Sequence, residues 1–213
     1  FQHAVERGYG VELDVQLSAD GEAMVFHDAE LDRLTGAAGR LRDKTARELR
    51  TLALSGSDET LPTLAEALTV IGRQGLVIIE LKTPPGEVGA LEKRVAEVLI
   101  DHAGPAAVAS FNPYSVAFFA DHHPKVLRGL ISYSYDDQPR LAVDQRRSFQ
   151  ALEHASIARP HFLSLGLDVL PSAAAAELRQ TGKPVIAWTV RSSDAWEGLK
   201  PACDNYIFEG FEP

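Results

Sequence analysis

Short apolar segments of strand length alternate along the chain with longer segments in which apolar residues recur at helical spacing. The strand-like segments are residues 11–15, 76–81, 107–110, 126–131, 162–165, 185–190 and 205–209. The helical spacing predicts helices at residues 64–72, 86–102, 113–121, 141–158, 172–181 and 193–200. Regular alternation of strands and helices is typical of a parallel sheet with crossover helices, so we expect an α/β fold.

The repetition favours an eight-stranded (β/α)₈ TIM barrel, with a doubly wound open sheet as the alternative that periodicity alone does not separate from it. The seven strand-like segments leave such a barrel one strand short. Apolar residues Phe1, Ala4 and Val5 share one face of a helix predicted over residues 1–8. Because a helix follows a strand in this pattern, the first barrel strand is expected upstream of Phe1. We therefore expect residues 1–213 to form a single, N-terminally incomplete barrel domain.

Two strand-like runs near the start of the chain are too close together for a crossover. Residues 11–18 and 22–28 are separated by Ala-Asp-Gly, whereas a parallel connection needs about a dozen residues. We expect an extra antiparallel hairpin here, with Asp20 and Gly21 as a two-residue turn. Glu12, Asp14 and His27 then share the polar face of the hairpin. The pairs expected are Ala19–Glu22, Leu17–Met24, Val15–Phe26 and Asp14–His27.

Three carboxylates at strand ends carry the candidate chemistry. Glu12 and Asp14 alternate along one strand, so they share a face and repel unless a cation lies between them. Glu80 follows a buried apolar run, where an unpaired charge is costly. The carboxyl ends of parallel barrel strands line one mouth, so the three acids are predicted to hold one divalent cation, Mg²⁺ or Ca²⁺. The alternatives are a solvated strand face for Glu12 and Asp14 and a local Glu80–Lys82 ion pair.

Three further residues complete the predicted site. His27, placed opposite Asp14, is the candidate for proton transfer, whereas its neighbour Asp28 is interpreted as a turn or cap residue. Lys82 shares a face with Glu80 and would supply a cation for an anionic substrate. Trp188 lies near the end of a buried strand, where core packing is the default and a pocket wall is the alternative.

Composition narrows the functional classes. The net charge of −9 argues against nucleic acid or an anionic membrane as a partner bound through a general positive field. Cys203 is the single cysteine, so the chain forms no internal disulfide and has no CxxC motif. Without an apolar run of about 20 residues, no membrane span is expected, and the cytoplasm is the expected compartment.

Several motifs occur in the same order as in a known family. The most specific is ELDVQLSADGEAMVFHD at residues 12–28. It is followed by LDRLTG (31–36), LPTLAEAL (61–68), IIELK (78–82), SFNP (110–113) and AWTV (187–190). Along nearly its whole length, the chain resembles the glycerophosphodiester phosphodiesterase family.

This resemblance implies a (β/α)₈ barrel that hydrolyses small-molecule glycerophosphodiesters to glycerol 3-phosphate and an alcohol. It implies metal ligands at Glu12, Asp14 and Glu80, a catalytic histidine at His27, a phosphate contact at Lys82 and a glycerol contact at Trp188. The family's His-Arg-Gly motif, which supplies a second catalytic histidine, has no counterpart here and is expected upstream of Phe1. Glu209 stands where the family more often has Thr-Asp. The alternatives are a lipid-acting phosphodiesterase resembling spider-type phospholipase D and a non-catalytic barrel that binds a phosphorylated ligand.

Overall fold

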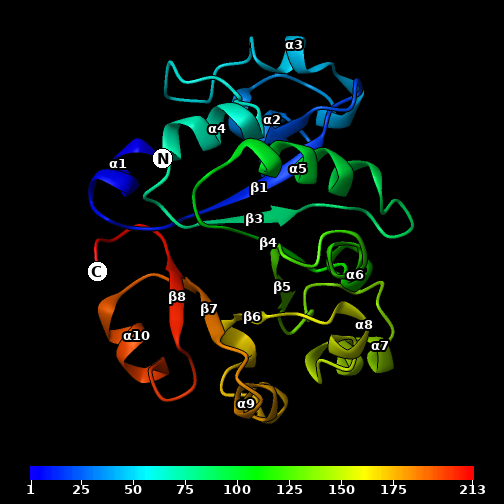
Figure 1. Cartoon of the computed structure of the whole chain (residues 1–213), viewed down its shortest axis with the longest axis vertical. Helices are drawn as coiled ribbons and strands as arrows, with labels where there is room; N and C mark the ends of the chain where they lie inside the picture. Colours follow the sequence, from blue (N-terminus) through cyan, green and yellow to red (C-terminus); the bar gives the residue numbers. More distant parts are fainter. The chain divides into compact units, whose positions relative to one another are not determined.

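The computed structural model describes all of residues 1–213, which divide into two compact units, Phe1–Val108 and Ala109–Pro213 (Figure 1). The first unit contains α1 (Gln2–Glu6), β1 (Val11–Leu17), β2 (Ala23–Val25), α2 (Asp32–Thr35), η1 (Leu41–Asp43), α3 (Ala46–Leu49), α4 (Leu64–Ile71), β3 (Val77–Leu81) and α5 (Ala90–Asp101). Strand β4 (Ala106–Ser110) spans the point where the first unit ends.

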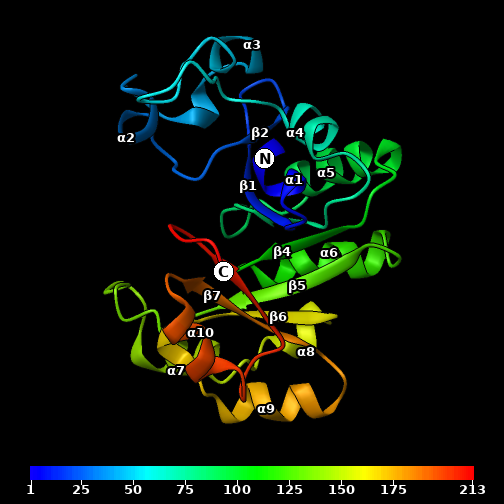
Figure 2. The same ribbon diagram turned by 90° about the vertical axis from the view of Figure 1, so that its left-hand side faces the viewer.

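Strands β1 and β3 form the parallel centre of the first unit, and helices α4 and α5 run alongside them (Figure 2). Every residue of β3 is buried, as expected for a parallel strand covered on both faces. Burial alternates along β1, where Val11, Leu13 and Val15 are buried and the residues between them are half-buried. The half-buried face of β1 is therefore the one that carries Glu12 and Asp14.

Strand β2 pairs with β1 in an antiparallel hairpin, which confirms the predicted hairpin but not its register. The observed pairs are Val15–Val25, Gln16–Met24 and Leu17–Ala23, one residue away from those predicted. The loop has three residues rather than two, because the Ser18 N–H donates to the Glu22 carbonyl and the Ser18 hydroxyl accepts from the Glu22 N–H. Gly21 sits in this loop at φ +86°, a conformation that favours glycine.

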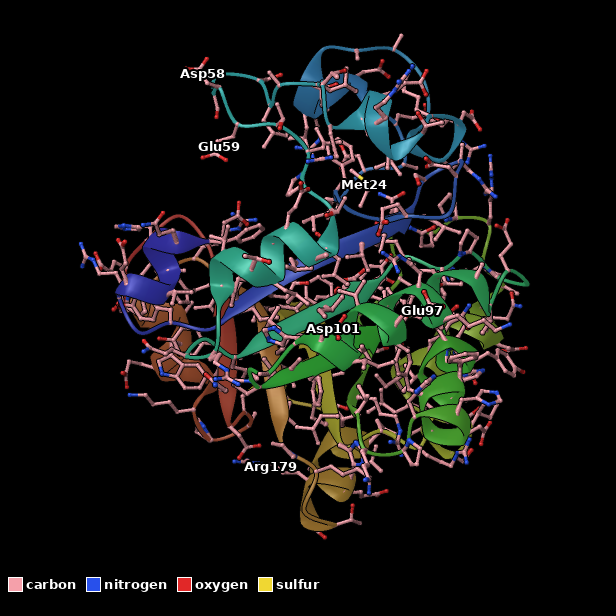
Figure 3. All side chains as sticks on the ribbon, turned by 45° about the horizontal axis from the view of Figure 1, so that its top comes forward. Met24, Asp58, Glu59, Glu97, Asp101 and Arg179 are labelled. Atoms are coloured by element: carbon pink, nitrogen blue, oxygen red, sulfur yellow. The ribbon has the colours of Figure 1, made fainter.

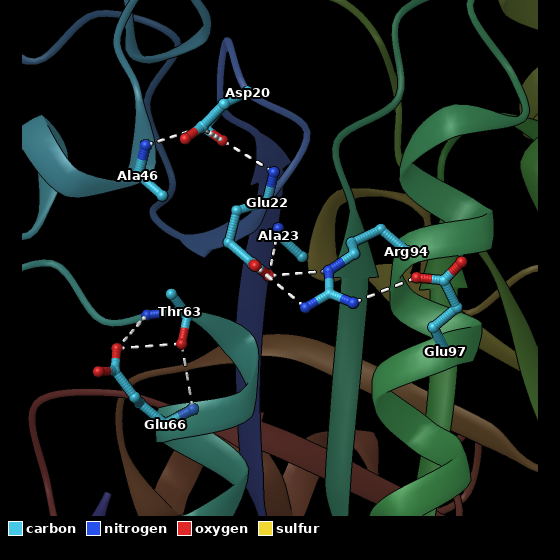
Figure 4. A network of polar contacts seen from close by, with 9 residues as sticks. Asp20, Glu22, Ala23, Ala46, Thr63, Glu66, Arg94 and Glu97 are labelled. Carbon is cyan, nitrogen blue, oxygen red and sulfur yellow. Dashed lines mark hydrogen bonds and ion pairs between the residues drawn. The ribbon is translucent and has the colours of Figure 1, made fainter.

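The hairpin is fastened to the rest of the first unit by polar contacts (Figure 4). Arg94 of α5 donates from Nε and Nη2 to the two carboxylate oxygens of Glu22, both at 3.0 Å, and its Nη1 donates to Glu97. The Asp20 carboxylate accepts the Ala46 N–H at the start of α3. This bracing holds the turn, and with it the register of β1 against β2.

The connection between β2 and α4 covers a small apolar core of its own. Its buried residues are Met24, Phe26, Leu31, Leu41, Leu49 and Leu61. Figure 3 shows Met24 inside this region and the acids Asp58 and Glu59 on the loop that leads to α4. This core anchors the segment that follows β2, where His27 lies.

The second unit contains four parallel strands in the order β5, β6, β7, β8. The strands are β5 (Leu127–Ser132), β6 (Phe162–Gly166), β7 (Val185–Val190) and β8 (Asn205–Phe208). The helices are α6 (Pro113–His122), α7 (Val143–Gln150), α8 (Ala155–Ala158), α9 (Ala173–Gln180) and α10 (Ser193–Leu199), with a short η2 (Leu167–Val169). All seven strands read from the sequence are present within a residue or two of their predicted bounds.

The single helix predicted over residues 141–158 is wrong, because α7 and α8 are separate. Leu152 lies between them at φ +55° and is only 5% exposed. Its side chain packs into the core with Ala155 and Leu163, so the chain leaves helical geometry where this residue is buried. No helix of the structure combines the length and apolar character that crossing a bilayer demands.

Candidate active site

The two parallel strands of the first unit bring three carboxylates together. In the β1–β3 register, Asp14 lies opposite Glu80, while Glu12 lies opposite Ile78. Side-chain oxygens of Glu12, Asp14 and Glu80 all lie within 4.8 Å of one another. The structure thus joins the three predicted metal ligands in one cluster, with Glu80 buried and the other two half-buried.

Lys82 supplies the positive charge beside this cluster. Its Nζ lies 2.9 Å from Oδ1 of Asp14 and also forms an ion pair with Glu80. Burial lowers the pKa of Lys82, but the neighbouring Glu80 and Asp14 carboxylates outweigh it, so the net effect is a raised pKa. The ammonium therefore stays charged at neutral pH. Both the local Glu80–Lys82 ion pair and the acidic cluster predicted from the sequence are present.

One ammonium does not balance three carboxylates. Burial, together with the charges of Asp14 and Glu80, raises the pKa of Glu12 to about 8, although the ammonium of Lys82 opposes this rise. Burial also raises the pKa of Glu80, with Lys82 opposing. Without an additional positive charge, a proton must therefore remain in the cluster at neutral pH.

The donor set fits a divalent metal ion. All of its atoms are carboxylate oxygens, which Mg²⁺ and Ca²⁺ prefer, and they converge within one coordination sphere. Oε1 of Glu80 is shielded from water and is already paired with the ammonium of Lys82, so this buried carboxylate lies in a place that accommodates positive charge. The three acids can therefore hold the ion, and Lys82 would remain beside it to meet an anionic ligand.

His27 lies just beyond the end of β2 and not opposite Asp14, which corrects the predicted cross-strand pair. The residue that meets Asp14 is Phe26, whose N–H donates to the Asp14 carbonyl at 3.0 Å. The three-residue turn causes this shift by one position. His27 nevertheless lies close enough to the acids to interact with them electrostatically. This is seen in its effect on Glu80, whose pKa the positive form of His27 lowers.

Three residues around His27 were not recognised from the sequence. Nδ1 of His27 lies 2.7 Å from Oδ1 of Asp28, the residue interpreted as a turn or cap. Arg33 binds the same carboxylate, and Gln16 donates to main-chain carbonyls of this segment. A signal was present: an arginine stands five residues after the His-Asp pair, in LDRLTG.

Trp188 belongs to the second unit, on β7, and is partly buried. Its ring meets that of Phe111 edge to face, with centroids 5.8 Å apart, and Tyr133 lies 6.1 Å away. The aromatic packing expected by default is present, and its role as a substrate contact stays a prediction. Glu209, also in this unit, forms an exposed ion pair with Arg191.

Comparison with solved structures defines the class of the fold. A phosphodiesterase from Oleispira antarctica, solved with the product sn-glycerol-3-phosphate, matches with a TM-score of 0.79 at 24% identity. The match covers 97% of this chain and 84% of that protein. The chain is therefore an α/β protein of the (β/α)₈ barrel class, as the alternation of strands and helices predicts.

The family follows from the sequence. The model of the glycerophosphoryl diester phosphodiesterase family matches residues 1–203, and the chain belongs to this family, whose members depend on a divalent metal. A glycerophosphodiester phosphodiesterase of Caldanaerobacter subterraneus is 34% identical over 143 residues, or 62% of this chain and 58% of that protein. A glycerophosphodiester phosphodiesterase of Bacillus altitudinis is 33% identical over 151 residues, which are 65% of this chain and 61% of that protein. The chain thus spans about three fifths of the length of these curated relatives.

Proposed function

We propose that the protein hydrolyses glycerophosphodiesters to glycerol 3-phosphate and an alcohol, with the help of one divalent cation, Mg²⁺ or Ca²⁺. The observation that carries this proposal is the convergence of Glu12, Asp14 and Glu80 beside Lys82 in a member of this family. The structural relative that binds sn-glycerol-3-phosphate as its product supports the choice of substrate.

The three acids would hold the cation, which when bound supplies a Lewis acid for a phosphate oxygen. Lys82 would add positive potential at the phosphate, in a partly buried position where charge interactions are stronger than in bulk water. Trp188 would contact the glycerol end of the substrate. In these assignments the acids, the lysine and the tryptophan have separate tasks.

His27 would transfer the proton as general acid or base. Its side chain is 61% exposed, so a substrate can reach it, and Nδ1 is already engaged by Asp28. Nε2 is therefore the nitrogen that would exchange a proton with the attacking water or with the leaving alcohol. For the protein's location we propose the cytoplasm, where the buried Cys203 thiol would stay reduced.

The test is release of glycerol 3-phosphate from glycerophosphocholine by the full-length protein, with Mg²⁺, with Ca²⁺ and with a chelator. We expect release that depends on the metal. A His27→Ala variant should lose about 10²–10⁴-fold in turnover and keep its metal affinity, whereas His3→Ala, on the exposed face of α1, should behave as wild type. A folded, metal-binding protein that releases no glycerol 3-phosphate would contradict the proposed substrate.

A further inference from the structure

The His27 imidazole is held on its Nδ1 side by a charged network. Oδ1 of Asp28 lies 2.7 Å from Nδ1, and the same carboxylate accepts two hydrogen bonds from Arg33. Arg33 Nε donates to Oδ2 at 2.6 Å, and Arg33 Nη2 donates to Oδ1 at 2.7 Å. This bidentate hydrogen bonding orients the Asp28 carboxylate and leaves Oδ1 directed at the imidazole.

The network determines which nitrogen of His27 carries the proton. Hydrogen bonds from Arg33 are the largest influence on Asp28, and they hold its pKa at about 2. An ionised carboxylate only accepts hydrogen bonds, so Nδ1 of His27 must be the donor. A neutral imidazole has a single N–H, which leaves the lone pair on Nε2.

The main chain around His27 is fixed separately, by Gln16. Its Nε2 lies 2.9 Å from the carbonyl of Phe26, 2.7 Å from that of Asp28 and 3.2 Å from that of His27 itself. Gln16 is on β1, two residues after Asp14 and on the same strand face. The segment that carries His27 is therefore tied to the strand that carries two of the three acids.

We propose that Asp28, Arg33 and Gln16 are positioning residues for His27. Asp28 holds the Nδ1–H tautomer and stabilises the imidazolium that forms when Nε2 takes up a proton, and Arg33 orients Asp28. Gln16 sets the distance of the main chain from the acidic strand. The inference rests on the proposed function in one respect, the proton-transfer role of His27. If these contacts only stabilised the loop, changing them would alter stability but not the tautomer or the catalytic pH profile.

The tautomer is tested directly by ¹⁵N NMR of the histidine side chains in the full-length protein. For wild type we expect His27 to carry its proton on Nδ1 at a pH where the ring is neutral. Asp28→Asn should abolish this preference, because an amide presents either an oxygen or an NH₂ group to Nδ1. Asp121→Asn removes a comparable exposed arginine ion pair, to Arg159 in the second unit, and should leave the His27 signals unchanged.

Kinetics test whether the network acts through His27. Asp28→Asn should lower kcat about 10- to 100-fold, with KM and metal affinity little changed and the acid limb of the pH profile shifted down. Arg33→Met and Gln16→Met should lower kcat by smaller factors. In a His27→Ala background, all three changes should have no further effect on kcat.

Two results would overturn the inference. One is a wild-type His27 that carries its proton on Nε2, and the other is an equal loss of kcat from Asp28→Asn with and without His27. The first requires no variant, so it holds even where a substitution prevents folding. If wild type shows the Nδ1–H tautomer but releases no glycerol 3-phosphate, the proposed function fails while the positioning geometry stands.

Discussion

Nζ of Lys82 lies 2.9 Å from Oδ1 of Asp14, across the parallel ladder that joins β3 to β1. The same ammonium is paired with Glu80, so one cation is shared by two of the three acids. Lys82 thereby neutralises part of the negative charge that a divalent ion would otherwise have to neutralise alone. In the proposed site, Lys82 would compete with the metal for the carboxylates and would attract a phosphate.

These two roles of Lys82 predict opposite changes on substitution. Lys82→Met should leave the metal affinity equal to or above that of wild type, because the acids lose a competing cation. The same change should lower kcat/KM about 10²–10³-fold, because positive potential at the phosphate is lost. Calorimetric metal titration and steady-state kinetics measure the two effects. Lys183→Met, at a half-buried lysine of the second unit that donates to Thr181, serves as control. A large loss of metal affinity in Lys82→Met would contradict this assignment.

Glu12→Gln should separate folding from metal binding. Burial raises the pKa of Glu12 to about 8, so in the metal-free protein this side chain is protonated at pH 7 and resembles a glutamine. An unfolded glutamate is ionised at pH 7, so folding of the metal-free wild type has to take up a proton there, whereas folding of the glutamine variant does not. The free energy of unfolding of the metal-free variant should therefore exceed that of wild type at pH 7, and the difference should disappear as the pH falls below about 4. Metal affinity should fall at least about tenfold, since a neutral amide is a weaker ligand than a carboxylate.

Denaturant unfolding and metal titration check the Glu12 prediction. Glu97→Gln is the matched control, because Glu97 lies on the exposed face of α5 (Figure 3). Unchanged metal affinity in Glu12→Gln would remove Glu12 from the metal site.

The Asp28 carboxyl should titrate well below an ordinary aspartate. Hydrogen bonds from Arg33 hold its pKa at about 2 in the folded protein, against about 3.9 in an unfolded chain. Because the folded pKa is the lower one, this pair contributes stability above about pH 4, and the contribution disappears as the pH falls towards 2. Solvent screening keeps it below about 1 kcal/mol. Carboxyl ¹³C NMR should show the low midpoint in wild type and a clearly higher midpoint in Arg33→Met, in which His27 alone still lowers the pKa of Asp28. Identical midpoints would contradict the pairing.

Gly129 should tolerate no side chain. A Cβ at this position would lie 2.3 Å from the ring of Phe162 on the neighbouring strand β6. Gly129→Ala should therefore destabilise the protein by about 1–3 kcal/mol through overpacking, as measured by denaturant unfolding. Gly198→Ala is the opposite case: nothing lies within 4 Å of its Cβ, and alanine favours helix α10, so a gain of up to about 1 kcal/mol is expected.

The strands were predictable because their signal is local. Parallel strands such as Val77–Leu81 and Val185–Val190 are short apolar runs bounded by turn residues, and nothing distant in the chain changes that interpretation. The hairpin register was not predictable to one residue. The register depends on the two hydrogen bonds between Ser18 and Glu22, which lengthen the turn. The sequence Ala-Asp-Gly is compatible with a two-residue and with a three-residue loop.

The sequence by itself determined the alternation of strands and helices, the shared strand face of Glu12 and Asp14, and the motifs of the family. Each of these follows from side-chain period or from residue identity, which the chain carries locally. Only the tertiary structure decided that Glu80 and Lys82 meet Asp14, because that contact requires the parallel register of two strands far apart in sequence. It also decided that Asp28 contacts the His27 side chain and is not simply a turn residue. An arginine on the following helix donates a hydrogen bond to the same carboxylate.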